Sequence, residues 1–346
     1  MNKKWLILLT LLVMALGTGC GGGGDKPVLN VYNWGDYIDE EVLRQFEEET
    51  GISIVYDTYD RNEDMYIKLK TGGTPYDVCV PSDYMIEKMI REEMLAEINL
   101  ANVPNYKSVM ERFKGLSFDP ENKYSVPYLW GTIGIVYNTE VVTAPVDSWS
   151  VLWDPQYSGK ILMMDSPRDA FMVAQKKLGI SMNSAAPEDI ERAKGELIAQ
   201  KPLVLAYVND SVKDMMINDE AALAVAWSGE AIYMLENNEK LAYAVPKEGT
   251  NMWFDNLVIP KDAPNKEAAE KFIDFLCRPD IALKNAQYIG YSTPNQGAYD
   301  LMEESVRQNT VVYPDEAVVG QSEVYKDLGP AYVEMLDRAW TEVKVK

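Results

Sequence analysis

The chain of 346 residues contains no histidine. This absence excludes Ser-His and Cys-His nucleophile pairs, a histidine general base near neutral pH and most transition-metal sites. The three cysteines, at positions 20, 79 and 277, lack the Cys-x-x-Cys spacing of zinc and redox sites. Cys79 lies in an apolar run and Cys277 in a helical apolar stripe, so both are expected to be buried free thiols. The sequence therefore predicts neither a metal site nor a cofactor.

Positive charge is scarce, because 33 Lys and Arg residues stand against 54 Asp and Glu residues, for a net charge of −21. Such a surface repels nucleic acid and attracts cationic ligands. An acidic coat that serves only solubility explains the charge equally well. With 47% hydrophobic residues, the chain can bury a sizeable core, and its length suits two domains.

The amino terminus has the pattern of an exported protein. An apolar run over residues 5–16 is too short to span a membrane but suits the core of a signal peptide, which we expect at 1–19. Small residues then lead to Cys20, in a pattern that resembles the bacterial lipoprotein box, where the cysteine becomes lipidated. Residues 20–26 are expected to form the lipidated Cys20 and a glycine-rich tether. The alternative is a secreted protein with an incidental cysteine.

From residue 28, short apolar or β-branched runs alternate with longer amphipathic stretches, which is typical of an α/β fold. A first helix is expected at 39–50, because apolar side chains recur at helical spacing and Gly51 follows at the position of a C-cap. The remaining strands are expected at 28–32, 52–56, 77–80, 133–137, 203–207, 222–226 and 256–259, and the remaining helices at 63–70, 85–93, 187–201 and 264–277.

Four short stretches place an aromatic ring close to a carboxylate, and one further tyrosine stands alone. An alkylammonium ion that leaves water loses its hydration energy, which carboxylates and the faces of aromatic rings can replace. Three of the stretches follow expected strands, where open α/β sheets bind ligands. They can meet only if two lobes face each other across a cleft. The candidate residues are Trp34, Asp36, Tyr37, Ser82, Asp83, Tyr84, Trp227, Glu230, Trp253, Asp255 and Tyr291.

Each candidate has an ordinary structural alternative. A tryptophan near the end of a strand commonly belongs to the core, and an acid after a strand commonly caps the next helix. For Asp36 and Asp83, a role as a helix cap and nothing more is such an alternative. The tryptophans without an adjacent matched acid are expected to pack in the core; these are Trp130, Trp149, Trp153 and Trp340.

Taken together, the motifs resemble the periplasmic-type spermidine/putrescine-binding proteins of bacterial ABC transporters, over nearly all of the mature chain. They are YNWGDY at 32–37, PSDY at 81–84, WSGE at 227–230, WFD at 253–255 and GYSTPN at 290–295. The resemblance implies a two-lobed α/β fold of the periplasmic-binding-protein type II, which closes on its ligand like a hinged clamp. Gly131 and Gly134 fall near the expected crossing between the lobes. The implied boundaries are 27–131 with 254–301 for lobe 1, and 136–250 with 306–346 for lobe 2.

The same resemblance implies a ligand cage whose rings line a polymethylene chain and whose carboxylates hold its amines. Its carboxylates would be Asp36, Asp169, Glu230 and Asp255. Its rings would be Trp34, Tyr37, Trp227, Trp253 and Tyr291. Two positions depart from the family, because Gly35 replaces a common hydroxyl residue and Tyr325 replaces a glutamine of spermidine binders. Glu230 resembles an acid of putrescine-preferring members, and up to four acids suffice for either amine.

The resulting expectation is a monomeric, lipid-anchored protein at the outer face of the cell membrane that delivers spermidine or putrescine to an ABC permease. It would not be an enzyme. One alternative is a binding protein for another solute, such as a different small organic cation. Another is an extracellular hydrolase that uses a carboxylate pair as acid and base, although no motif places two acids at catalytic separation. A signalling partner that recognises the closed form is a further alternative.

Overall fold

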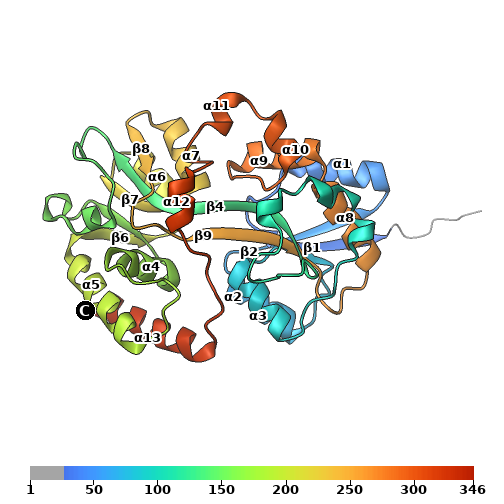
Figure 1. The fold of residues 1–346 in the computed structure, drawn as a ribbon, viewed down its shortest axis with the longest axis horizontal. Helices are drawn as coiled ribbons and strands as arrows, with labels where there is room; N and C mark the ends of the chain where they lie inside the picture. The colour runs from blue at the N-terminus through green and yellow to red at the C-terminus, as the bar shows by residue number, and fades with distance from the viewer. Residues whose placement is uncertain (1–26) are drawn as a thin grey trace, which may run out of the picture.

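The computed structural model describes residues 27–346. The signal peptide, Cys20 and the glycine-rich tether predicted at 1–26 lie outside the described residues. Two α/β lobes flank a pair of long antiparallel strands, β4 (Ser125–Asn138) and β9 (Met252–Val258), which runs through the middle of the molecule (Figure 1). Within the described range, the strands follow the order β2-β1-β3-β9-β4-β7-β5-β6, and β8 pairs with β4.

The first lobe is built on parallel strands that join the central pair through β9. Strand β1 (Val28–Trp34) pairs with β2 (Ser53–Tyr59) and β3 (Val78–Cys79), and β3 pairs antiparallel with β9. The helices of this lobe are α1 (Glu40–Thr50), α2 (Asn62–Thr71), α3 (Asp83–Arg91), α8 (Lys266–Leu276), α9 (Pro279–Ile289) and α10 (Gln296–Leu301).

The second lobe joins the central pair through β4. Its strands are β5 (Ile161–Met164), β6 (Val204–Val208), β7 (Leu223–Trp227) and β8 (Leu241–Ala244). Its helices are α4 (Pro167–Lys177), α5 (Pro187–Gln200), α6 (Val212–Ile217), α7 (Ser228–Asn237) and α13 (Pro330–Val345). Two short helices, α11 (Glu304–Arg307) and α12 (Glu316–Gln321), lie in the connection from α10 to α13. Short 3-10 helices occupy Leu100–Asn102, Pro104–Ser108, Glu111–Phe113, Trp149–Trp153, Pro155–Tyr157 and Lys201–Leu203.

Helix α1 begins and ends as its sequence predicts. The Asp39 side chain accepts a hydrogen bond from the backbone N–H of Glu41, at 2.8 Å. Gly51 ends the helix with φ +72°, in the left-handed region that favours glycine. The loop that carries Asp36 and Tyr37 is therefore held between β1 and a well-defined helix start.

The sequence analysis predicted no strand at β5 or β8, and both central strands begin earlier than expected. Strand β4 begins eight residues before the expected start at 133, and β9 begins at Met252 rather than 256. Gly131 and Gly134 lie inside β4, and close packing explains both. A Cβ atom on Gly131 would lie 2.6 Å from the Trp253 ring, and one on Gly134 would lie 2.4 Å from the Tyr243 ring.

The buried aromatic and thiol groups match the prediction. Cys79 and Cys277 are buried and free. Three of the four tryptophans expected in the core are buried. The fourth, Trp153, is partly buried against the core of the second lobe, and its indole N–H donates to the Glu196 carbonyl at 2.9 Å. The buried three are Trp130, Trp149 and Trp340.

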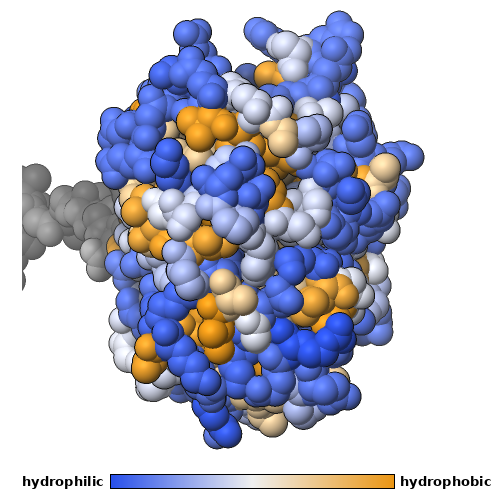
Figure 2. All heavy atoms as spheres, turned by 90° about the vertical axis from the view of Figure 1, so that its left-hand side faces the viewer, coloured by the Kyte–Doolittle hydropathy of each residue, from blue (hydrophilic) through white to orange (hydrophobic). Residues whose placement is uncertain are grey.

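The outer face of the second lobe is mostly hydrophilic, with hydrophobic side chains in separate patches (Figure 2). No helix within residues 27–346 combines the length and the apolar character needed to cross a bilayer.

Candidate ligand-binding site

Asp255 is the centre of the predicted cage. It lies on β9 with 6% of its surface exposed, and it accepts hydrogen bonds from the Tyr37 hydroxyl at 2.8 Å and the Ser82 hydroxyl at 2.6 Å. Burial raises the pKa of the Asp255 carboxyl to about 6, although the two hydroxyls favour its charged form. Three segments far apart in the sequence thus meet at one carboxylate.

Three aromatic rings pack beside this carboxylate. The Tyr291 ring lies edge-on to the Trp253 ring, with centroids 4.8 Å apart, and to the Tyr37 ring at 5.9 Å. A Cβ atom on Gly229 would lie only 2.4 Å from the Tyr291 ring, so helix α7 of the second lobe presses against it. The Trp253 indole N–H is buried and has no hydrogen-bond partner among the described residues. Tyr291 therefore connects the first lobe, the central pair and the second lobe.

The two tryptophans at strand ends are partly buried. Trp34 is the last residue of β1, and its indole N–H donates to the Val80 carbonyl at 2.8 Å. Its ring lies 4.6 Å from that of Tyr59. Trp227 is the last residue of β7 and packs against the core of the second lobe. Both rings are held by the fold while keeping some exposed surface.

Glu230 lies in the first turn of α7. One of its carboxylate oxygens is buried without a hydrogen-bond partner among the described residues, and the other lies 3.9 Å from the Lys213 ammonium. Burial raises the pKa of Glu230 to about 7, opposed by the charge of Lys213. The charges of Glu230 and Asp255 both raise the pKa of Tyr291. This indicates that the two acids flank the same tyrosine.

Asp169 lies in the first turn of α4 with 8% of its surface exposed, and it accepts a hydrogen bond from the Tyr325 hydroxyl at 3.0 Å. Burial raises the pKa of Asp169. The Arg168 guanidinium beside it lies 4.1 Å from the Tyr84 ring centroid. The Tyr84 hydroxyl donates to Glu63 at 3.1 Å. A second group of acids and rings thus spans the two lobes.

Asp83 and Asp36 have different surroundings from the other predicted acids. Asp83 is fully buried, and its oxygens accept the backbone N–H groups of Tyr84 at 2.7 Å and Phe254 at 3.0 Å. Burial raises its pKa to about 8. This geometry favours the structural alternative, in which Asp83 ties α3 to β9. Asp36 is exposed in the loop after β1, with φ +48°.

Sequence reasoning missed Arg168 and Glu63 and left the role of Tyr325 open. Arg168 directly precedes Asp169, and Glu63 stands in the first turn of α2. Charged residues are ordinary at both positions, so no signal in the sequence marks them. Their contacts arise only where α2, α3, α4 and the segment before α13 pack together.

Two cavities lie elsewhere in the molecule. One is lined by apolar residues around Leu129 and Leu257, and the other by residues 176–181 with Glu248 and Glu323. None of the twelve predicted ligand residues lines either cavity. Two of these residues instead contact the second lobe directly, since the Tyr291 ring packs against Gly229 of α7 and the Tyr84 ring lies beside Arg168 of α4.

Comparisons with known proteins identify the family of the chain. Residues 41–311 match the family described as bacterial extracellular solute-binding protein. The chain is 39% identical over 332 residues to the spermidine/putrescine-binding periplasmic protein of Escherichia coli, covering 95% of each chain. It is 31% identical to the putrescine-binding periplasmic protein PotF of Escherichia coli, covering 99% of this chain and 98% of that one.

Solved structures of the same fold include two bacterial proteins. The spermidine/putrescine ABC transporter substrate-binding protein PotD of Streptococcus pneumoniae has a TM-score of 0.84 and 42% identity, covering 92% of this chain and 99% of that chain. The TpPotD lipoprotein of Treponema pallidum has a TM-score of 0.83 and 25% identity, covering 92% of this chain and 100% of that chain. The chain therefore belongs to the bacterial extracellular solute-binding proteins and has their two-lobed α/β fold.

Proposed function

We propose that this protein binds a polyamine, putrescine or spermidine, between its two lobes and delivers it to an ABC permease. The observation that carries the proposal is the buried Asp255 carboxylate, held by two hydroxyls and flanked by aromatic rings. The names of the relatives support the same ligand class. Those relatives are binding proteins for transport, and this family member is a binding protein rather than an enzyme.

At one end of the ligand, we assign the first ammonium group to Asp255. The Tyr37 and Ser82 hydroxyls orient the carboxylate, so its remaining acceptor capacity is directed at the ligand. The Trp253 ring can cover the adjacent methylene groups, each worth about 0.8 kcal/mol on burial.

At the other end, Glu230 and Asp169 are the candidate partners for the remaining amines. Both are largely buried carboxylates of the second lobe, and each lies near a tyrosine. Putrescine carries two charges and spermidine three, so two or three carboxylates suit either. We propose Trp34, Tyr37, Ser82, Tyr84, Asp169, Trp227, Glu230, Trp253, Asp255 and Tyr291 as ligand contacts, with Asp83 as their support and Asp36 at the edge.

We also propose that the lobes comprise residues 27–131 with 254–301, and 136–250 with 306–346. The central pair supports these boundaries, because β4 and β9 contribute to both halves of the sheet. Opening would change the contacts of Tyr291 with α7 and of Tyr84 with α4. The ligand and the permease would then select the same closed conformer.

We further propose that the protein is a monomer, anchored outside the cell membrane by a lipid on Cys20. The match to an extracellular family supports export, and the Treponema relative is named a lipoprotein. A Cys20→Ala variant expressed in the native host is expected to move from the membrane fraction to the soluble exported fraction. Retention in the membrane fraction would contradict the anchor.

Calorimetric titration tests the ligand assignment. A soluble form that starts at residue 25 is titrated with putrescine and spermidine, with choline and glutamate as controls. We expect tight one-to-one binding of at least one polyamine and none of either control. Binding of choline but of neither polyamine would favour a different organic cation, and a lack of all binding would limit the resemblance to the fold.

A further inference from the structure

A set of contacts joins the two lobes without using Asp255 or Glu230. Arg91, the last residue of α3, forms an ion pair with Asp327 of the second lobe. The backbone N–H of Asp327 also donates to the Glu87 carboxylate at 2.7 Å. The Asp327 side chain is 7% exposed, so the pair is largely shielded from solvent on that side. Helix α3 thus holds Asp327 through both its backbone and its side chain.

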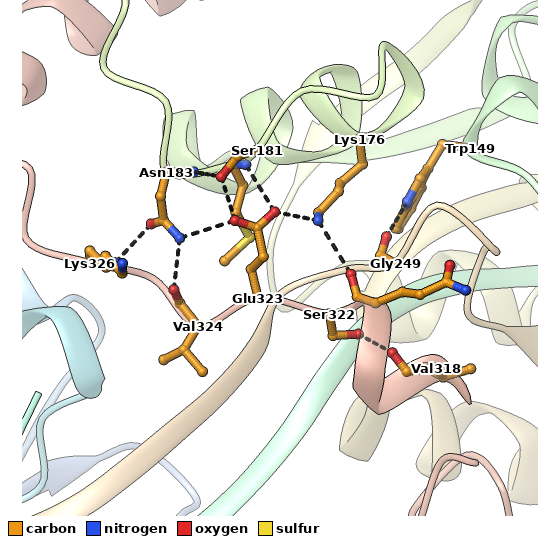
Figure 3. A network of polar contacts seen from close by, with 12 residues as sticks. Trp149, Lys176, Ser181, Asn183, Gly249, Val318, Ser322, Glu323, Val324 and Lys326 are labelled. Atoms are coloured by element: carbon orange, nitrogen blue, oxygen red, sulfur yellow. Dashed lines mark hydrogen bonds and ion pairs between the residues drawn. The ribbon is translucent and has the colours of Figure 1, made fainter. Parts of the chain in front are cut away.

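Residues 322–329, which lead into α13, are in turn fixed to the second lobe. Asn183 donates to the Val324 carbonyl at 2.9 Å and accepts the Lys326 N–H at 2.9 Å (Figure 3). Glu323 accepts a hydrogen bond from the Lys176 ammonium at 2.5 Å, within the same network (Figure 3). The segment that carries Asp327 therefore moves with the second lobe rather than as a loose loop.

Arg168 adds a second contact across the lobes. Its guanidinium lies 4.1 Å from the ring centroid of Tyr84 on α3, and 4.9 Å and 5.8 Å from those of Tyr325 and Tyr332 in its own lobe. It also donates to the Lys326 carbonyl at 3.2 Å. Within residues 27–346 it forms no ion pair with a carboxylate, so the ring of the opposite lobe is a principal partner of its charge.

We propose that Arg168 and the Arg91–Asp327 pair form a latch that holds the lobes closed, and that they strengthen ligand binding by positioning the lobes. The inference rests on the proposed function for its binding readout. The apparent affinity of a ligand is its intrinsic affinity multiplied by the fraction of the protein in the binding-competent state. A latch that changes this fraction therefore changes the affinity of every ligand by the same factor. A ligand contact instead changes the affinities of ligands with different charges unequally.

Four variants test the latch: Arg91→Met, Asp327→Asn, Arg168→Met and the conservative Arg168→Lys. Arg338→Met is the matched control, because Arg338 is exposed on α13 and, among the described residues, forms an ion pair only with Glu334 of the same helix. Calorimetry and stopped-flow dissociation are measured with both putrescine and spermidine.

We expect the first three variants to weaken both amines by the same factor, roughly three- to tenfold, through faster dissociation. The Arg91→Met/Asp327→Asn double variant should bind polyamine no more weakly than whichever single variant has the lower affinity, because the two residues form one pair. Arg168→Lys should recover part of the loss, and Arg338→Met should match the parent. The latch is refuted by a loss that differs more than threefold between the two amines, by unchanged dissociation rates or by an equal loss in the control.

A distance measurement tests the latch without any ligand. Spin labels are placed at two exposed positions, Ile67 of the first lobe and Val333 of the second. The labels are introduced into the soluble form that starts at residue 25, which lacks Cys20, and the native Cys79 and Cys277 are buried and do not compete for the label. The latch variants should show longer distances than the parent, and unchanged distances would overturn the latch. If the parent bound no polyamine, the proposed function would fail while this measurement still decided the latch.

Discussion

Replacing Asp255 with Asn separates ligand binding from folding. Asn keeps the size of the side chain and can still bond to the hydroxyls of Tyr37 and Ser82, because each hydroxyl can donate or accept. The variant loses only the charge that faces the ammonium group. Hydrogen bonds to charged groups contribute about 1.5–3 kcal/mol. We therefore expect polyamine affinity to fall by roughly 10- to 150-fold.

The stability of the ligand-free variant should not fall. Burial raises the pKa of Asp255 from 3.8 to about 6, so above pH 6 the charged carboxylate destabilises the folded protein by roughly 3 kcal/mol. Asn carries no charge and avoids this cost. Thermal unfolding of the ligand-free Asp255→Asn variant at pH 7.5 should therefore give a melting temperature at least equal to that of the parent.

Asp274→Asn is the matched control for this experiment. The Asp274 carboxylate is bound by the backbone and side-chain amides of Asn105, at 2.7 Å and 3.0 Å, within the first lobe. The control should leave polyamine affinity unchanged in calorimetric titrations at pH 7.5. If Asp255→Asn bound polyamine as tightly as the parent, or if Asp274→Asn lost as much affinity, the assignment of the cage would be wrong.

Affinity for either amine should rise from pH 5 to pH 8, because only charged carboxylates attract ammonium groups and the pKa values of Asp255 and Glu230 are raised to about 6 and about 7. A flat affinity profile in calorimetric titrations across this range would contradict the assignment. Gly229→Ala should weaken polyamine binding by roughly tenfold or more, since the Cβ atom of the alanine would lie 2.4 Å from the Tyr291 ring. Calorimetry measures the loss, and an affinity equal to that of the parent would place Tyr291 outside the site. Asp36→Asn should weaken binding by less than about fivefold, as expected for an exposed charge, and a larger loss in the same titration would show that the loop moves onto the ligand.

Most strands of the two lobes were predictable because each is a short apolar or β-branched run, but β5 and β8, each four residues long, were not predicted. Strand β7, for example, occupies Leu223–Trp227 where 222–226 was expected. The central pair was harder to predict. Strand β4 is buried along nearly its whole length, so it shows no alternation of polar and apolar residues, and Pro127 and two glycines resemble turn signals.

The group around Asp255 was predictable in part, since rings stand next to acids in its motifs and Tyr37 and Ser82 lie in segments that follow strands. The sequence could not separate a ligand contact from a cap at Asp83, because both roles place an acid at the same helix start. The contacts of Arg168, Glu63 and Tyr325 arise where α2, α3, α4 and the segment before α13 meet. No local pattern encodes that meeting.

The buried acids give a physical reason why a cationic ligand should stabilise the closed arrangement further. Burial raises the pKa values of Asp83, Asp169, Glu230 and Asp255, and of these only Glu230 has a cationic side chain within 4.0 Å among the described residues. Closing the lobes removes water from such carboxylates, which opposes closure unless another group supplies positive charge. A ligand with two or three ammonium groups supplies that charge only when the lobes are closed, so its binding energy is coupled to closure. A neutral molecule of the same shape would leave the carboxylates unpaired, and charge rather than shape therefore accounts for a preference for amines.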